Sequence, residues 1–158
     1  MDARLNLFKI PGIGTFTQHL HGMNKAVTDA GIPETTQELV RLRVSQINGC
    51  GFCTDMHFKD AVAAGEDAVR LNMVAVWREA TVFTPAERAA LALAEGGTRI
   101  ADNAPGVTDE TWAAVVEHYD EKQQFALILL VSLMNTVNRM NAINRTPAGS
   151  YVAGQFAH

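Results

Sequence analysis

The sequence predicts an all-α protein, a compact multi-helix subunit, and three observations favour this fold class. Signals for strands are almost absent, because few β-branched runs alternate and no Asn-Gly or Asp-Gly hairpin separates such runs. Ala, Leu, Glu and Arg, which form helices readily, dominate the apolar segments. Of the 158 residues, 47% are hydrophobic and 19% are charged, a composition typical of a folded soluble protein rather than a disordered one. We therefore expect one domain over residues 1–158.

The first two helices are predicted from apolar periodicity and from the residues that flank it. The apolar residues of the first helix recur at helical spacing until Gly31-Ile32-Pro33 stops them: Phe16, Leu20, Met23, Ala26 and Val27. Thr35 or Thr36 is expected to cap the next helix, which carries Glu38. That helix ends at Asn48-Gly49, a sequence suited to a left-handed C-terminal cap.

A third helix is expected to start at or near Cys50 and to end at Gly65, which reads as its C-terminal cap. One or two short helical pieces follow between Glu66 and Ala80. Thr84-Pro85-Ala86-Glu87 is a strong helix start, with a Thr cap, Pro at the first helical position and Glu three residues after the cap. The helix that it opens is predicted to run to about Ile100.

The last third of the chain holds two more predicted helices. A loop through Asp102–Gly106 precedes a short helix capped by Thr108. Asp120 followed by Gln123 resembles a second capping box, and it opens the most apolar helix, from Phe125 to about Asn141. The residues from Pro147 onward look like a tail.

Charge and the N-terminal sequence bear on partners and compartment. The net charge is −4, and no stretch collects enough like charge for a nucleic-acid footprint or a membrane patch, so we predict neither partner. Residues 1–5 lack a signal-peptide pattern, and the longest apolar run, Phe125–Leu133, is far short of a membrane span. We expect a cytoplasmic protein. In that reducing compartment two close cysteines are catalytic, redox-active or metal-bound more often than structural.

Both cysteines of the chain lie in one motif, C-x-x-C-x-x-x-H, formed by Cys50, Cys53 and His57. At a helix N-terminus, unsatisfied backbone N–H groups and the helix dipole stabilise a thiolate, which lowers the pKa of such cysteines below the free value of about 8.5. Residues at i and i+4 share a helix face, so Cys53 and His57 are neighbours. Cys50 and Cys53, at i and i+3, can close a disulfide.

Glu38 enters the predicted site through the antiparallel arrangement of its helix and the next one. With a rise of about 1.5 Å per residue, Glu38 lies roughly 15 Å back from the Gly49 turn and His57 roughly 10 Å beyond it, so the two can face each other. A carboxylate beside His57 would fix the ring tautomer and raise its basicity. Glu38 would then orient His57, and His57, directly or through a water, would take the proton of Cys53.

A structural or zinc-binding role also remains open for these residues. Cys50, Cys53 and His57 are three plausible zinc ligands, with Glu38 needed as the fourth, although no second Cys or His pair follows at finger spacing. The remaining histidines are better explained as structural or surface residues than as ligands: His19, His21, His118 and His158.

The stretch Glu38–His57 resembles the signature of the alkylhydroperoxidase D-like members of the carboxymuconolactone decarboxylase family. These proteins share a Glu, two cysteines separated by two residues, and a His at the spacing found here. The resemblance continues through Trp77–Ala80, Phe83–Leu91 and Asn138–Asn141, so it covers most of the chain.

The resemblance implies an all-α subunit that assembles into homotrimers or homohexamers and reduces alkyl hydroperoxides. Cys53 would attack the peroxide and become a sulfenic acid, Cys50 would resolve it into a disulfide, and His57 with Glu38 would form the proton relay. No bound cofactor is implied. An external dithiol, from a reductant protein or a lipoyl-type donor, would regenerate the enzyme at the more exposed Cys50. The best-studied family peroxidases carry a second histidine where this chain has Phe52, and here we expect the largest difference from an efficient peroxidase.

Two other functions are compatible with parts of this sequence. One is a redox-sensing or chaperone-like oligomer that retains the cysteine pair with little turnover. The other is a lactone decarboxylase, which only the family name suggests. Members with that activity generally lack the C-x-x-C pair, so Cys50 and Cys53 argue against it.

Overall fold

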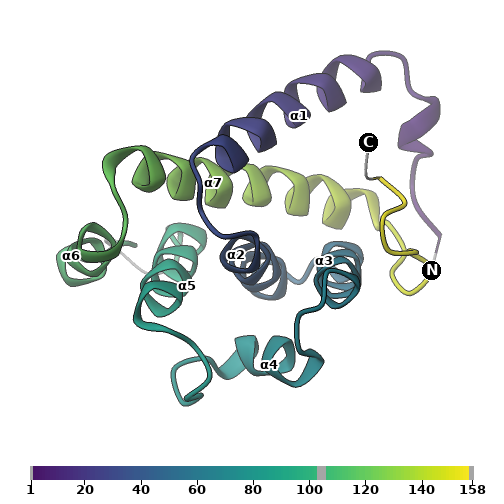
Figure 1. Ribbon diagram of the computed structural model, residues 1–158. Coiled ribbons are helices and arrows are strands. Elements are labelled where there is room, and N and C mark those ends of the chain that lie inside the picture. The colour runs from purple at the N-terminus through teal and green to yellow at the C-terminus, as the bar shows by residue number, and fades with distance from the viewer. Residues whose placement is uncertain (1, 103–105, 157–158) are drawn as a thin grey trace.

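A computed structural model describes residues 2–102 and 106–156, and within these ranges the chain forms helices and no strand (Figure 1). The all-α prediction is therefore confirmed. The elements are η1 (Leu7–Lys9), α1 (Ile13–Asp29), α2 (Glu34–Ile47), α3 (Gly51–Ala63), α4 (Ala68–Asn72), η2 (Met73–Val76), α5 (Pro85–Thr98), α6 (Asp109–His118) and α7 (Glu121–Asn144).

Helix α2 lies at the centre of the fold, between α3 and α5 and below α7, and α1 runs along α7 (Figure 1). Two groups of buried apolar side chains hold this arrangement. One joins α1, α2, α5, α6 and α7 and includes Val40, Leu93 and Leu130; the other joins α2 and α5 to α3, α4 and η2 and includes Leu42 and Trp77. Because α2 contributes to both groups, its position relative to α3 and α7 is tightly determined.

The helix starts follow the predicted capping chemistry. At α5 the Thr84 hydroxyl accepts from the Glu87 backbone N–H, and the Glu87 carboxylate accepts from the Thr84 N–H. Asp120 and Gln123 form the same reciprocal pair at α7, and Thr108 caps α6. Each cap satisfies backbone N–H groups that have no partner in the first turn, so these three predictions are confirmed.

The predicted cap of α2 was wrong. The helix begins at Glu34 with Pro33 at the N-cap, and Thr36 lies buried inside the first turn. Pro33 takes its usual φ of −51° and precedes the helix without a side-chain cap, while Gln37 donates from Nε2 to the Ile32 carbonyl at 2.9 Å. The turn is thus anchored by a side chain from within the helix rather than by a threonine before it.

Other boundaries differ by a few residues from the predicted ones. Helix α1 starts at Ile13, directly after Gly12 in the left-handed region (φ 92°), and α7 continues three residues past Asn141 to Asn144. The two short pieces expected before Ala80 are confirmed as α4 and η2. The predicted loop through Asp102–Gly106 includes residues 103–105, which lie outside the described residues.

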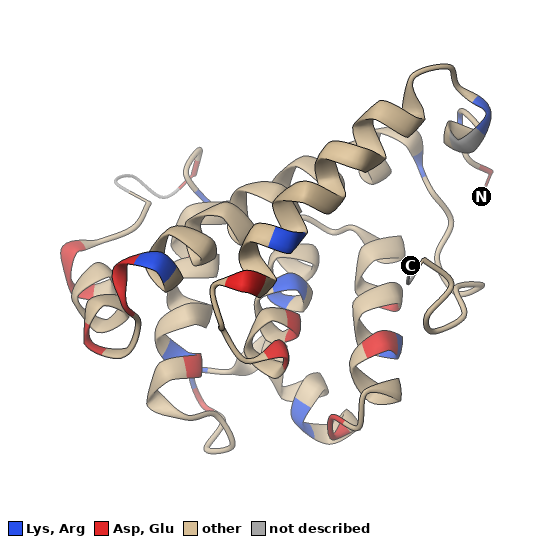
Figure 2. Cartoon of the chain, turned by 45° about the horizontal axis from the view of Figure 1, so that its top comes forward, with Lys and Arg blue, Asp and Glu red and all other residues tan. Residues whose placement is uncertain are grey.

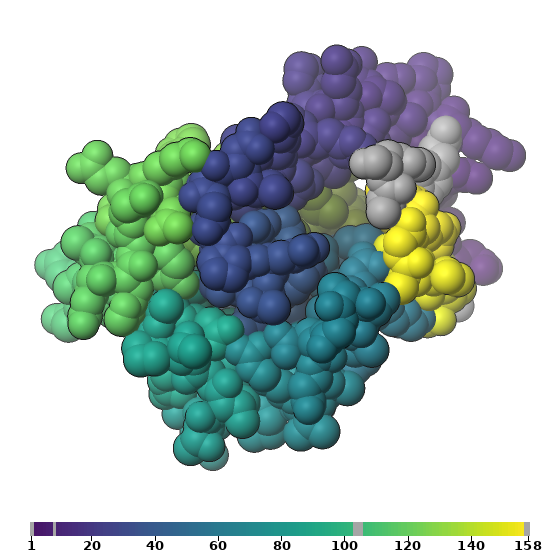
Figure 3. All heavy atoms as spheres, viewed as in Figure 1, coloured from purple at the N-terminus to yellow at the C-terminus, as the bar shows by residue number. Residues whose placement is uncertain are grey.

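The segment after Pro147 has no helix, but it is bound along α3 rather than extending as a free tail (Figure 3). Lys59 donates from Nζ to the carbonyls of Gly149 and Tyr151 at 3.1 and 3.0 Å. The Tyr151 hydroxyl donates to both carboxylate oxygens of Asp60 at 2.9 Å. We call residues 147–156 the C-terminal strap, because these bonds hold it across the face of α3.

Charges of both signs are spread over several helices, whereas the charged residues of α6 are all acidic: Asp109, Glu110 and Glu117 (Figure 2). By length and composition, α7 is the one described helix that would meet the requirements for crossing a membrane, with a mean hydropathy of 1.3. A core helix meets the same requirements. The eight buried residues of α7 include two asparagines, Asn138 and Asn144, and the helix contacts α1, α2 and α5.

Candidate active site

The turn between α2 and α3 brings the predicted residues together. Gly49 takes a left-handed conformation (φ 64°), which a glycine adopts without strain, and the Cys50 N–H donates to the Ser45 carbonyl at 3.0 Å. Cys50 is then the N-cap of α3, so the cysteine pair lies in the first turn of that helix. This placement agrees with the predicted one.

Cys50 and Cys53 form a disulfide with their Cα atoms 5.4 Å apart. The Cys53 backbone N–H donates to Cys50 Sγ at 3.3 Å, in the way that a serine or aspartate oxygen accepts at an N-cap. Cys53 is completely buried and Cys50 is 2% exposed. The N-terminus of α3 is therefore directed at Cys50, while Cys53 lies deeper.

Glu38 and His57 face each other across the helix pair, in the register that helix rise predicted. His57 Nδ1 lies 3.0 Å from Glu38 Oε2, and Glu38 Oε1 accepts from Arg41 Nη1 at 2.6 Å. Burial alone would raise the pKa of the Glu38 carboxyl, but hydrogen bonds and charge from His57 and Arg41 outweigh it and lower that pKa below its ordinary value. Glu38 is thus an ionised group held between two nitrogen donors.

The predicted link from His57 to the sulfur is not a direct hydrogen bond: within the described residues His57 bonds Glu38 and neither cysteine. His57 is one helical turn after Cys53 and is 8% exposed, so both side chains share the inner side of α3. The predicted base and the predicted nucleophile are therefore neighbours, and proton transfer between them would require a side-chain rotation or an intervening water.

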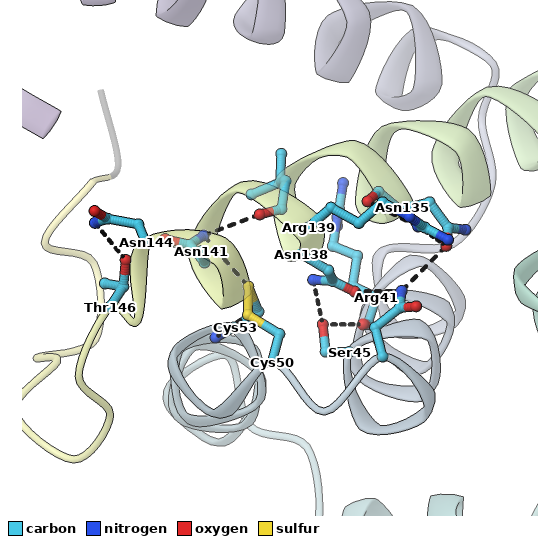
Figure 4. The surroundings of a disulfide bond; sticks show 12 residues. Arg41, Ser45, Cys50, Cys53, Asn135, Asn138, Arg139, Asn141, Asn144 and Thr146 are labelled. Carbon is cyan, nitrogen blue, oxygen red and sulfur yellow. Dashed lines mark hydrogen bonds between the residues drawn. A yellow bond between two sulfur atoms is a disulfide. The ribbon is translucent and has the colours of Figure 1, made fainter. Parts of the chain in front are cut away.

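Sequence reasoning missed two polar residues at the site. Arg41 was assigned no role, although its spacing of three residues from Glu38 on a predicted helix signals an ion pair. Asn141 lies on α7, and its Nδ2 is 3.5 Å from Cys53 Sγ (Figure 4). No local pattern connects Asn141 with a cysteine 88 residues earlier, so this contact needed the fold to be found.

A pocket of about 570 Å³ opens beside Cys50. It lies between the α2–α3 turn and the end of α7, and its lining includes Phe52, Asn141 and Arg145. Phe52 packs edge-to-face on Tyr151, with ring centroids 6.2 Å apart, and the Phe156 ring lies 6.4 Å away. The position that the resemblance singled out therefore contacts the C-terminal strap, and the phenyl ring of Phe52 has no group that can accept or donate a proton.

The remaining candidates lie apart from this site. His19, His21 and His118 are exposed on α1 and α6, and His158 lies outside the described residues. Among the described residues, no group of three or more His, Cys, Asp or Glu side chains is placed to hold a metal ion.

Comparison with known proteins identifies the family. The sequence profile of the carboxymuconolactone decarboxylase family matches residues 14–96, which include the complete Glu38–His57 stretch. The chain belongs to this family. Uncharacterized protein YdfG of Bacillus subtilis is 38% identical over 141 residues, covering 89% of this chain and 93% of YdfG. Uncharacterized protein YnjA of Escherichia coli is 30% identical over 112 residues, covering 71% of this chain and 60% of YnjA.

Solved structures give the same fold. A protein of unknown function from Agrobacterium tumefaciens, named as a candidate antioxidant defence protein AhpD, superposes with a TM-score of 0.85 at 28% identity, covering 95% of this chain and all of its own. The debrominase Bmp8 superposes with a TM-score of 0.75 at 19% identity, over 91% of this chain and 75% of its own. The chain thus has the AhpD-like fold, and the solved proteins that share this fold are named for different roles.

Proposed function

We propose that this protein is a thiol-dependent peroxidase that reduces alkyl hydroperoxides through Cys53 and Cys50. The observation that carries the proposal is the placement of the Cys50–Cys53 disulfide at the N-terminus of α3, beside the Glu38–His57 pair. The similarity to the Agrobacterium protein named for antioxidant defence supports the same class of reaction.

The reaction begins with the reduced pair. His57, oriented by Glu38, receives the proton of the Cys53 thiol, and the thiolate attacks the outer peroxide oxygen. The O–O bond breaks, the alcohol leaves with a proton, and Cys53 becomes a sulfenic acid. The Cys50 thiol then attacks the Cys53 sulfur, which forms the disulfide and releases water. Two electrons have passed from the two thiols to the peroxide.

Regeneration takes place from the side of Cys50. Cys50 lines the 570 Å³ pocket, whereas Cys53 is completely buried, so an incoming thiolate reaches Cys50 first. A dithiol reductant protein or a lipoyl-type donor would attack Cys50, release Cys53 and close its own disulfide in a second exchange. The chain needs no bound cofactor in this cycle, and we place the cycle in the reducing cytoplasm.

We also propose that the protein works as a homotrimer or homohexamer. Helix α1 carries no Asp, Glu, Lys or Arg from Ile13 to Asn24, and Val27 is its one buried residue. On α7, Phe125 and Ile128 are 61% and 47% exposed. A helix segment without Asp, Glu, Lys or Arg, together with exposed apolar side chains on the neighbouring helix, is the kind of surface that a second copy of the chain covers.

The test is a peroxidase assay with tert-butyl and cumene hydroperoxides on the wild type, Cys53→Ser and Cys50→Ser, with thiols counted before and after. The wild type should lose two thiols for each peroxide consumed. Cys53→Ser should be inactive, and Cys50→Ser should stop at a trappable sulfenic acid after one turnover. Full peroxide consumption by Cys53→Ser would exclude the proposed order of attack.

A second candidate, a redox-sensing or chaperone-like protein with little turnover, is favoured by the burial of both sulfurs and by the packing of Phe52 on the C-terminal strap. It predicts that the reduced protein reacts with peroxide no faster than a free thiol. Stopped-flow measurement of this first reaction separates the two candidates, because a peroxidase requires a faster step.

A further inference from the structure

Asn141 is the polar group that α7 contributes to Cys53. Its Nδ2 donates to the backbone carbonyl of Val137 at 3.2 Å and to Cys53 Sγ at 3.5 Å. Because the amide oxygen of an asparagine cannot donate to a carbonyl oxygen, the bond to Val137 determines which end of the amide is the nitrogen. The second N–H of that nitrogen is therefore the group that faces the sulfur.

The amide belongs to a row of asparagines that recur every three residues along α7, so that neighbouring members lie on adjacent faces and the row winds around the helix. Their other members bind different partners. Asn138 donates to Ser45 Oγ at 3.2 Å, Asn135 donates to Thr98 Oγ1 at 3.3 Å, and Asn144 donates to the Leu5 carbonyl at 3.2 Å. Among the described residues, Asn141 is the one side chain of α7 with a hydrogen bond to a sulfur (Figure 4).

The backbone of α3 does not replace this donor. The Cys53 N–H, which belongs to the first turn, donates to Cys50 Sγ. The helix N-terminus thus stabilises a negative charge on Cys50, and Cys53 depends on side chains for the same purpose. With Phe52 in the place of a polar residue, Asn141 and His57 are the polar side chains positioned to serve Cys53.

We propose that Asn141 is a catalytic residue, whose amide N–H stabilises the Cys53 thiolate and, after attack, the oxidised sulfur. The proposal rests on the proposed function in that Cys53 is the attacking cysteine. The acidity of the Cys53 thiol, however, can be measured without any turnover. A hydrogen bond to an ionised group is stronger than one to its neutral form, so the bond favours the thiolate over the thiol.

Charged groups on α3 and on the elements packed against it must stay unchanged in the test. They are His57, Asp55, Lys59 and Asp60 on α3, Glu38 and Arg41 on α2, Arg70 on α4, Arg139 on α7, and Arg145 directly after α7. Most of them have partners elsewhere, since Arg41 binds Glu38, Arg139 binds Asn135, and Asp60 binds the C-terminal strap. Substituting Asn141 alters none of these charges.

The experiment titrates Cys53 alone, in a Cys50→Ser background where a serine hydroxyl can keep the N-cap of α3. The ultraviolet absorbance of the thiolate is followed against pH for Asn141→Leu, Asn141→Asp and the control Thr136→Val, which alters the exposed side of α7. Asn141→Leu removes the amide N–H donor and should raise the midpoint of the Cys53 titration by about one pH unit. Asn141→Asp should raise it further, because a carboxylate repels the thiolate, and Thr136→Val should leave it unchanged.

An unchanged midpoint in folded Asn141→Leu would overturn the proposal. If that variant does not fold, the second measurement follows the NMR chemical shifts of the Asn141 side-chain amide in the Cys50→Ser protein against pH. These shifts should change at the pH at which the Cys53 thiol ionises. Shifts that stay constant through that pH would also overturn the proposal. If the wild type consumes no peroxide while these midpoints shift as expected, the proposed peroxidase function is refuted, and the proposed effect of the Asn141 hydrogen bond on the Cys53 thiol is supported. In an active protein, Asn141→Leu should slow the peroxide reaction about tenfold at neutral pH, in step with the smaller thiolate fraction.

Discussion

Replacing Glu38 by glutamine tests whether the buried carboxylate holds the site together. The substitution keeps the size of the side chain and removes its charge. The glutamine oxygen can still accept from Arg41, but the amide nitrogen takes the place of the oxygen that lies 3.0 Å from His57 Nδ1. Either the hydrogen bond to His57 is lost, or the ring turns into the tautomer that carries its proton on Nε2 and cannot accept one from Cys53.

The cost in stability can be worked out from these two bonds. A hydrogen bond to a charged group contributes about 1.5–3 kcal/mol, and breaking a buried ion pair leaves the partner charge uncompensated. The Glu38 and Arg41 side chains are 15% and 12% exposed, so water relieves part of this penalty. Since one bond to Arg41 is kept, we expect Glu38→Gln to lower the free energy of unfolding by about 2 kcal/mol at neutral pH.

The pH dependence identifies the carboxylate as the cause. Because the folded-state pKa of Glu38 lies below its ordinary value, its stabilisation is complete above the unfolded value of about 4.3 and is lost as the pH falls through the folded pKa. Protonated Glu38 is neutral like glutamine, so the two proteins should converge in acid. Urea unfolding from neutral to acidic pH measures this, with Glu117→Gln, on the exposed side of α6, as the control. A difference that stays constant down to the acid limit would refute the reasoning.

Three further changes test contacts within the fold, two of them at the C-terminal strap beside the site and one between α5 and the segment before α6. Phe52→Leu weakens the aromatic contact with Tyr151, and we expect the disulfide to be reduced by dithiothreitol about threefold faster, measured by thiol release under native conditions. Tyr151→Phe removes the hydroxyl that binds Asp60, and chemical unfolding should show a loss of about 1 kcal/mol; no loss would mean that the strap is held by its other bonds. Gly96→Ala would place a Cβ 2.7 Å from a backbone carbonyl oxygen and should cost about 2 kcal/mol in thermal unfolding, whereas the control Gly22→Ala, with no atom within 4 Å, should stabilise α1 by about 0.5–1 kcal/mol.

The parts of the fold that sequence could predict are those set by local chemistry. The capping boxes at Thr84 and Asp120 and the left-handed Gly49 depend on residues within one turn, so their patterns predicted them correctly. The start of α2 failed for a local reason as well. Two threonines resembled caps, but Pro33 and the side chain of Gln37 define that end of the helix.

The candidate site also has one part that the sequence could predict and one part that it could not. Glu38 and His57 face each other because of the helix rise and one tight turn, so counting residues along the two helices predicted their contact. Asn141 and Tyr151 reach the site from parts of the chain about 90 residues away, and only the packing of α7 and the C-terminal strap against α3 brings them there. Contacts of this kind depend on tertiary structure, on which a local pattern carries no information.

The two cysteines have different surroundings, and this asymmetry bears on both halves of the proposed cycle. Cys50 caps α3 and borders the pocket, whereas Cys53 is buried with an amide donor at its sulfur. In the oxidative half, that donor would favour the attacking thiolate. In the reductive half, a thiolate that attacks Cys50 expels Cys53, and a leaving thiolate of lower pKa departs faster. The hydrogen bond from Asn141 would thus accelerate both half-reactions, since each of them has a Cys53 thiolate, first as the nucleophile and then as the leaving group.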